Sequence, residues 1–74
     1  MRTIYLVKDL ARATGHSVYT VEHYLKEQLI QEFARSPYTQ YRFFDENAVT
    51  RLKRIRGLRK EGKSIPNIRM TLSK

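Results

Sequence analysis

The sequence has no cysteine and no tryptophan, and its 74 residues include only three glycines and two prolines. Without cysteine there are no disulfides, no thiolate zinc sites, no iron–sulfur ligands and no thiol nucleophile. Long apolar runs are also missing, because the N-terminal run Ile4-Tyr5-Leu6-Val7 is far shorter than a signal peptide or a membrane span requires. We therefore expect a cytoplasmic protein that does not enter a membrane.

Catalytic machinery is equally hard to find. A chain this short buries only about 60% of the surface that it exposes when unfolded, which leaves no room for a core plus a closed active site. No phosphate-binding glycine loop and no nucleophile–base pair is present, and His16 and His23 alone do not make a metal site. The sequence predicts a protein that is not an enzyme and binds no cofactor or metal.

Negative charge is scarce in the last third of the chain. Residues 1–50 hold as many acidic as basic side chains, whereas residues 51–74 oppose nine basic side chains with Glu61 alone. The formal net charge of +8 therefore lies beyond Thr50. Such a cationic surface attracts polyanions, most commonly nucleic acid. An anionic membrane, an acidic protein or a merely solvated surface would also explain the charge. Charge alone therefore does not decide between these explanations and nucleic acid.

The hydrophobic pattern predicts two short helices at the start of the chain. Apolar residues at helical spacing lead up to Gly15, a residue suited to ending a helix, and Ser17 can cap the next one. The apolar stripe expected on this second helix consists of Val18, Val21 and Leu25. Together these segments predict a helix-turn-helix over residues 6–28.

The remaining sequence predicts a hairpin and a closing pair of helices. Two β-prone runs around a proline-containing connection indicate a hairpin over residues 31–44. Asp45 then opens a longer helix that ends at Gly62, and Ser64 caps a last short helix, so the closing helices span residues 45–73. Four aromatic residues are expected in the core: Tyr24, Phe33, Phe43 and Phe44. The fold class is mainly α with a small β-hairpin wing, in one domain over residues 1–74.

Several segments resemble the MerR-type transcriptional regulators. Residues 5–17 (YLVKDLARATGHS) and the following Thr20-Val21 are similar to the opening helix-turn-helix of that family. Residues 41–46 (YRFFDE) resemble its wing and the helix start that follows, and residues 52–72 resemble its closing helix pair. The resemblance implies a winged helix-turn-helix that binds double-stranded DNA sequence-specifically and regulates transcription.

In such a domain the second helix would enter the major groove and the wing would follow the phosphate backbone. The DNA-binding residues expected on the second helix are Ser17, Tyr19, Thr20, His23 and Lys26. Those expected on the wing are Arg35, Tyr41 and Arg42. The third helix and the turn after it would contribute general electrostatic attraction through Arg54 and Lys63. Because helical residues spread around the axis, only two or three of the basic residues Arg51, Arg54, Arg56, Arg59 and Lys60 are expected to face one duplex.

Two departures from the family pattern matter. Glu22 stands where the family usually has an arginine, which removes a phosphate or guanine contact but leaves a carboxylate able to accept from a cytosine amino group. The family's regulators also continue into a long dimerising helix and an effector domain, whereas this sequence stops at Lys74. We therefore expect no small-molecule effector site within it, and leave open a homodimer or tandem copies on DNA.

Two other functions remain open. A small architectural DNA-binding protein of excisionase type would also be short, basic and winged, and would bind in tandem while bending DNA. A MerR-like protein-interaction module would have lost DNA recognition, which Glu22 and Leu25 on the second helix keep possible.

Overall fold

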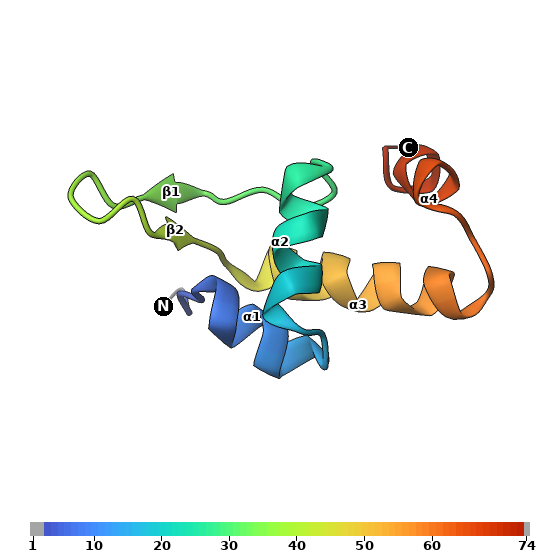
Figure 1. The fold of residues 1–74 in the computed structure, drawn as a ribbon, viewed down its shortest axis with the longest axis horizontal. Coiled ribbons are helices and arrows are strands. Elements are labelled where there is room, and N and C mark those ends of the chain that lie inside the picture. The colour runs from blue at the N-terminus through green and yellow to red at the C-terminus, as the bar shows by residue number, and fades with distance from the viewer. Residues whose placement is uncertain (1–2, 74) are drawn as a thin grey trace.

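The structure, a computed structural model, describes residues 3–73 and has the predicted order of elements. The elements are α1 (Val7–Thr14), α2 (Val18–Lys26), β1 (Ala34–Arg35), β2 (Arg42–Phe43), α3 (Glu46–Lys60) and α4 (Ile65–Leu72). The hairpin projects from one end of the molecule and the connection between α3 and α4 forms the other end (Figure 1). The predicted fold class, mainly α with a small β-hairpin wing, is confirmed. Among residues 3–73 no helix has the length and apolarity needed to cross a membrane.

The predicted helix starts are confirmed by side-chain caps. The Oγ of Ser17 accepts from the backbone N–H of Thr20 (3.1 Å), which satisfies one of the free donors at the start of α2. Asp45 and Ser64 do the same for α3 and α4. These short polar side chains therefore fix where three of the four helices begin.

The turn of the helix-turn-helix depends on Gly15. This residue ends α1 in the left-handed conformation, with φ at 75°. Arg56 on α3 reaches over it and donates from Nη1 to the carbonyl oxygens of Gly15 (2.7 Å) and Thr14 (3.1 Å). A Cβ at position 15 would clash with that nitrogen. Both the backbone angle and the close approach of Arg56 thus disfavour a side chain here, because a Cβ would be strained and would displace the guanidinium group.

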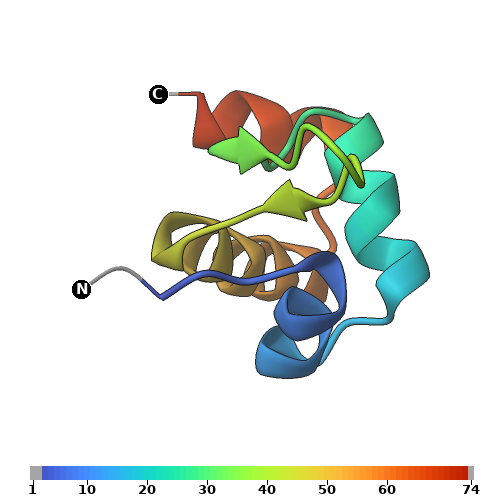
Figure 2. The ribbon, with the colours of Figure 1, turned by 90° about the vertical axis from the view of Figure 1, so that its left-hand side faces the viewer.

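One hydrophobic core joins all four helices. In Figure 2, which looks along the molecule from the wing, α1, α2 and α4 lie around α3. The buried apolar residues are Leu10, Ala11, Val21, Tyr24, Leu29, Ile30, Phe44, Ala48, Val49, Leu52, Ile55, Ile68 and Leu72. Since α3 contributes four of these, more than any other helix, it forms the centre of the core, and α1 and α4 pack against it.

The hairpin is short and is anchored to the N-terminal segment. Ala34 pairs with Phe43 and Arg35 with Arg42, so each strand holds two residues. Beyond the strands, Tyr5 and Phe44 exchange two main-chain hydrogen bonds of 2.8 Å each. This bridge fixes the base of the wing beside the start of α1.

Two expectations for core residues are wrong. Val18 is 43% exposed, because the buried face of α2 is centred on Val21 and Tyr24, and position 18 lies about 120° around the axis from Tyr24. Phe33 is 39% exposed, because it lies just before the first strand of the hairpin and outside the cluster of buried core residues. Tyr24 and Phe44 are buried as predicted, and Phe43 is half-buried.

A small polar cluster occupies the inside of the helix-turn-helix turn. The hydroxyl of Thr14, a buried residue, donates to the carbonyl of Leu10 (2.7 Å) and lies 2.8 Å from Nδ1 of His16. Because the single hydroxyl proton is used on Leu10, Nδ1 carries a hydrogen that it donates to Thr14. The imidazole also stands edge-on to Tyr24 at a centroid distance of 5.8 Å. Desolvation first, and then the nearby positive charge of Arg56, lowers the pKa of His16.

We expect Gly15→Ala to lower the free energy of unfolding by about 1–2 kcal/mol for the left-handed backbone alone, with a further loss from displacing Arg56. Urea unfolding followed by circular dichroism would measure this. A variant as stable as the wild type would contradict the importance of the Gly15–Arg56 contact.

Gly57→Ala should have the opposite effect. Gly57 lies inside α3, and a Cβ there would meet no atom within 4 Å. The added methyl group restricts the unfolded chain without a steric cost, so the free energy of unfolding should rise by about 0.5–1 kcal/mol. The same urea measurement tests this, and destabilisation would show that α3 needs glycine at this position.

Acidification should destabilise the fold through His16. Since the folded state favours the neutral imidazole, the unfolded chain takes up the proton first as the pH falls through about 6.5. When the pH is lowered from 7.5 to 5.5, the urea midpoint of the wild type should therefore decrease. The urea midpoint of His16→Gln should decrease by less. His23→Gln, which makes the same change at the exposed second histidine, is the variant with which His16→Gln is compared. If the urea midpoints of His16→Gln and the wild type decreased equally on acidification, His16 would not be the cause of the acid destabilisation.

Candidate nucleic-acid interface

One face of α2, which we call its free face, carries side chains that the described residues 3–73 leave exposed. Val21 and Tyr24 point into the core, while Tyr19, 80% exposed, lies on the opposite side. The exposed side chains on this free face are Val18, Tyr19, Glu22, His23 and Lys26. A helix that presents polar and aromatic side chains along one open face can enter a groove of a duplex.

Ser17 and Thr20, also predicted on this surface, lie at the start of α2. The Ser17 hydroxyl donates to Oγ1 of Thr20 at 2.9 Å while accepting from the Thr20 backbone. Thr20 is half-buried and Ser17 is exposed. Both hydroxyls thus already stabilise the helix start.

The wing arginines share one carboxylate. Nη2 of Arg35 lies 2.8 Å from Oε2 of Glu32, and Nε of Arg42 lies 3.8 Å from Oε1 of the same residue. Partial burial raises the pKa of Glu32, but a backbone hydrogen bond and the contacts with Arg35 and Arg42 outweigh this and leave the pKa below its usual value. The carboxylate therefore stays ionised and holds the two guanidinium groups on the exposed side of the hairpin.

A groove joins the wing to the helix-turn-helix. It has a volume of about 360 Å³, and residues of α2, of the wing and of the start of α1 form its walls. The residues that matter most here are Val18 and Glu22 from α2, Tyr41 and Arg42 from the wing, and Val7 and Lys8 from α1. The structure thus brings the predicted wing residues Tyr41 and Arg42 next to the free face of α2.

Lys8 is a residue of this groove that the sequence reasoning missed. Its side chain is exposed in the first turn of α1, at the edge of the groove. A positive charge in the first turn of a helix opposes the helix dipole and is unfavourable for the helix itself. That mismatch is a signal in the sequence that could have indicated a role in binding.

Several basic residues of the C-terminal half donate hydrogen bonds to main-chain carbonyls and so stabilise the fold. Arg56 binds the end of α1, as described above, and Nε of Arg51 donates to the carbonyl of Leu29. Nη1 of Arg59 donates to the carbonyl of Lys63 (3.2 Å). Two or three DNA contacts were expected from the set Arg51, Arg54, Arg56, Arg59 and Lys60. Within residues 3–73, only Arg54 and Lys60 of this set have no hydrogen bond or ion pair.

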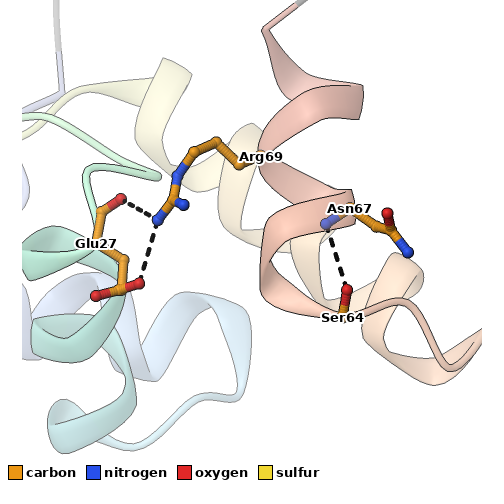
Figure 3. A network of polar contacts seen from close by, with 4 residues as sticks. All are labelled: Glu27, Ser64, Asn67 and Arg69. Carbon is orange, nitrogen blue, oxygen red and sulfur yellow. Dashed lines mark hydrogen bonds and ion pairs between the residues drawn. The ribbon is translucent and has the colours of Figure 1, made fainter.

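Arg69 likewise connects two helices. As Figure 3 shows, its Nη2 donates to the carbonyl oxygen of Glu27 (2.9 Å) and lies 3.1 Å from Oε1 of that residue. The same figure shows the cap at the other end of α4, where the backbone N–H of Asn67 donates to Ser64. Through Arg69, α4 is attached to the C-terminal end of α2.

The predicted binding residues fall into two groups. The wing residues Tyr41 and Arg42 line the groove, and the predicted residues of α2 lie on the helix that supplies Val18 and Glu22 to its wall. Lys63, in contrast, lies in the α3–α4 connection at the opposite end of the molecule (Figure 1). The longest dimension of the molecule is 38 Å, so one ligand that touches both groups must be extended. No set of three His, Asp or Glu residues within residues 3–73 is arranged to hold a metal ion.

The comparisons with known proteins agree with this architecture. The family model described as "MerR HTH family regulatory protein" matches residues 5–74. No curated protein sequence is similar enough to be matched to the chain. Among solved structures, the chain is similar to HiNmlR, described as a MerR family regulator lacking the sensor domain and bound to promoter DNA, with a TM-score of 0.84 and 27% identity. The match covers 96% of this chain and 53% of HiNmlR, so the chain spans about half the length of that regulator. The chain belongs to the MerR helix-turn-helix family of regulatory proteins.

Proposed function

We propose that the chain is the DNA-binding part of a MerR-type transcription regulator, which places α2 in the major groove of double-stranded DNA and the wing along the adjacent phosphate backbone. The observation that carries this proposal is the groove in which Tyr41 and Arg42 of the wing adjoin the free face of α2. The similarity to a regulator described as bound to promoter DNA supports it. Such a regulator would work in the cytoplasm and perform no reaction.

The residues would divide between base edges and phosphates. Tyr19, His23 and Lys26 on the exposed face of α2 would approach base edges and their flanks. Ser17 and Thr20 would lie near phosphates at the helix start. The remaining proposed contacts are phosphate contacts from Lys8, Arg35, Tyr41, Arg42, Arg54 and Lys63. Phosphate contacts would position the domain, and contacts from α2 would select the sequence.

Residues 1–74 would act as one unit, with the helix-turn-helix over residues 6–28, the wing over residues 31–44 and the closing helices over residues 45–73. One copy covers a single half-site, so two copies, as a homodimer or in tandem on DNA, would be needed for tight binding.

A salt titration tests the proposal. Fluorescence anisotropy would compare a duplex from the region upstream of the protein's own gene with a scrambled duplex of equal composition. The wild type should bind the native duplex at least about tenfold more tightly. Arg42→Ala should weaken binding to both duplexes and reduce the slope of log K against log salt by about 1 for each bound copy, because each copy loses one phosphate contact.

Arg42→Lys is the matched control, because it keeps the charge and should keep the salt slope. Equal affinity for both duplexes with strong DNA bending would favour an architectural protein instead. Weak binding to both duplexes, unchanged by Arg42→Ala, would refute DNA recognition and favour a protein-interaction module.

A further inference from the structure

Most acidic side chains of this chain form a hydrogen bond or an ion pair that stabilises the fold. Asp9 and Asp45 accept backbone hydrogen bonds at helix starts, and Glu46 accepts from the hydroxyl of Tyr5. Glu27 pairs with Arg69, and Glu32 holds the two wing arginines. The seven acidic residues of the sequence therefore leave two, Glu22 and Glu61, whose side chains form no hydrogen bond or ion pair within residues 3–73.

These two free carboxylates lie in very different places. Glu61 is the exposed residue that ends α3. Glu22 lies in the middle of α2, on its free face, and forms part of the groove between α2 and the wing. Lys8 and Arg42 line the same groove, yet neither comes within the 4 Å of a salt bridge to Glu22. The fold thus leaves a negative charge in the middle of the surface proposed to meet a polyanion.

This position is costly for binding unless DNA supplies a donor. When α2 enters the major groove, Lys8 and Arg42 are drawn to phosphates, and the carboxylate of Glu22 loses its water. A desolvated carboxylate without a donor weakens binding strongly. In the major groove the cytosine N4 amino group is the donor with which Glu and Asp pair, whereas guanine and thymine present acceptors that repel a carboxylate.

We propose that Glu22 is a specificity-determining residue that selects a cytosine in the DNA target, by accepting a hydrogen bond from its N4 amino group. The selection works mainly by rejection, because guanine or thymine at this position leaves the carboxylate buried without a donor, and adenine presents its N6 donor beside the N7 acceptor. This inference rests on the proposed function, in which α2 enters the major groove. Glu22 would thus read a base although its negative charge lowers the general affinity of the domain for DNA.

A selection from a library of randomised duplexes tests the inference and lets the protein itself define the target. Wild type and Glu22→Gln would be selected in parallel and the enriched sequences compared. The wild-type target should contain one position where cytosine dominates. In the Glu22→Gln target that preference should be lost or move to adenine, with which an amide pairs.

Anisotropy on the selected duplex gives the size of the effect. Replacing that cytosine by thymine, with its partner base changed to match, should weaken wild-type binding by about tenfold or more and Glu22→Gln binding by less than about threefold. On a mixed-sequence duplex, Glu22→Gln should bind more tightly than the wild type, because a repulsive charge has been removed. The variant would thus gain affinity and lose discrimination together.

Glu61→Gln is the control, because it makes the same change at the other free carboxylate. It should select the wild-type target and keep the tenfold discrimination. Both residues are exposed, so both variants should unfold at the wild-type urea concentration. A Glu22→Gln target identical to that of the wild type would overturn the inference while leaving DNA binding intact. If the wild type selects no target at all, the proposed function itself fails.

Discussion

The pair of main-chain hydrogen bonds between Tyr5 and Phe44 sets the geometry on which the proposed interface depends. A hairpin with two residues in each strand has little stability of its own. The bridge attaches its base to the segment before α1, and the fully buried ring of Phe44 fixes it in the core. As a result the start of α1 and the end of the wing face each other, and α2 completes the groove. The bridge and the buried Phe44 ring together fix the wing relative to the helix-turn-helix.

Features that depend on neighbouring residues in the sequence were predicted well. Ser17, Asp45 and Ser64 cap helices because a short polar side chain finds donors within three residues, and Gly15 ends α1 because few other residues adopt its backbone angle. The burial of individual side chains was harder to predict, because it depends on which other elements of the fold pack against each side chain. Val18 has a plausible helical spacing, yet the packing of Tyr24 turns it outward.

The candidate interface could be predicted only in part for the same reason. The sequence predicted that α2 and the wing form the interface, and in the structure Val18 and Glu22 of α2 line one groove with Tyr41 and Arg42 of the wing. It could not separate binding cations from structural ones, because Arg51 and Arg56 find their carbonyl partners 22 and 41 or 42 positions away along the chain. Nor could it show that the Glu22 carboxylate, in the middle of the groove, has no partner within residues 3–73.

The arginine contacts with main-chain carbonyls have a practical consequence for handling the protein. Arg51 and Arg56 donate to neutral carbonyl oxygens at partly buried positions, and dissolved ions screen such contacts far less than exposed pairs of opposite charge. Phosphate contacts, in contrast, weaken steeply as ions are added. Concentrated salt should therefore strip contaminating nucleic acid from the protein during purification while its tertiary structure survives.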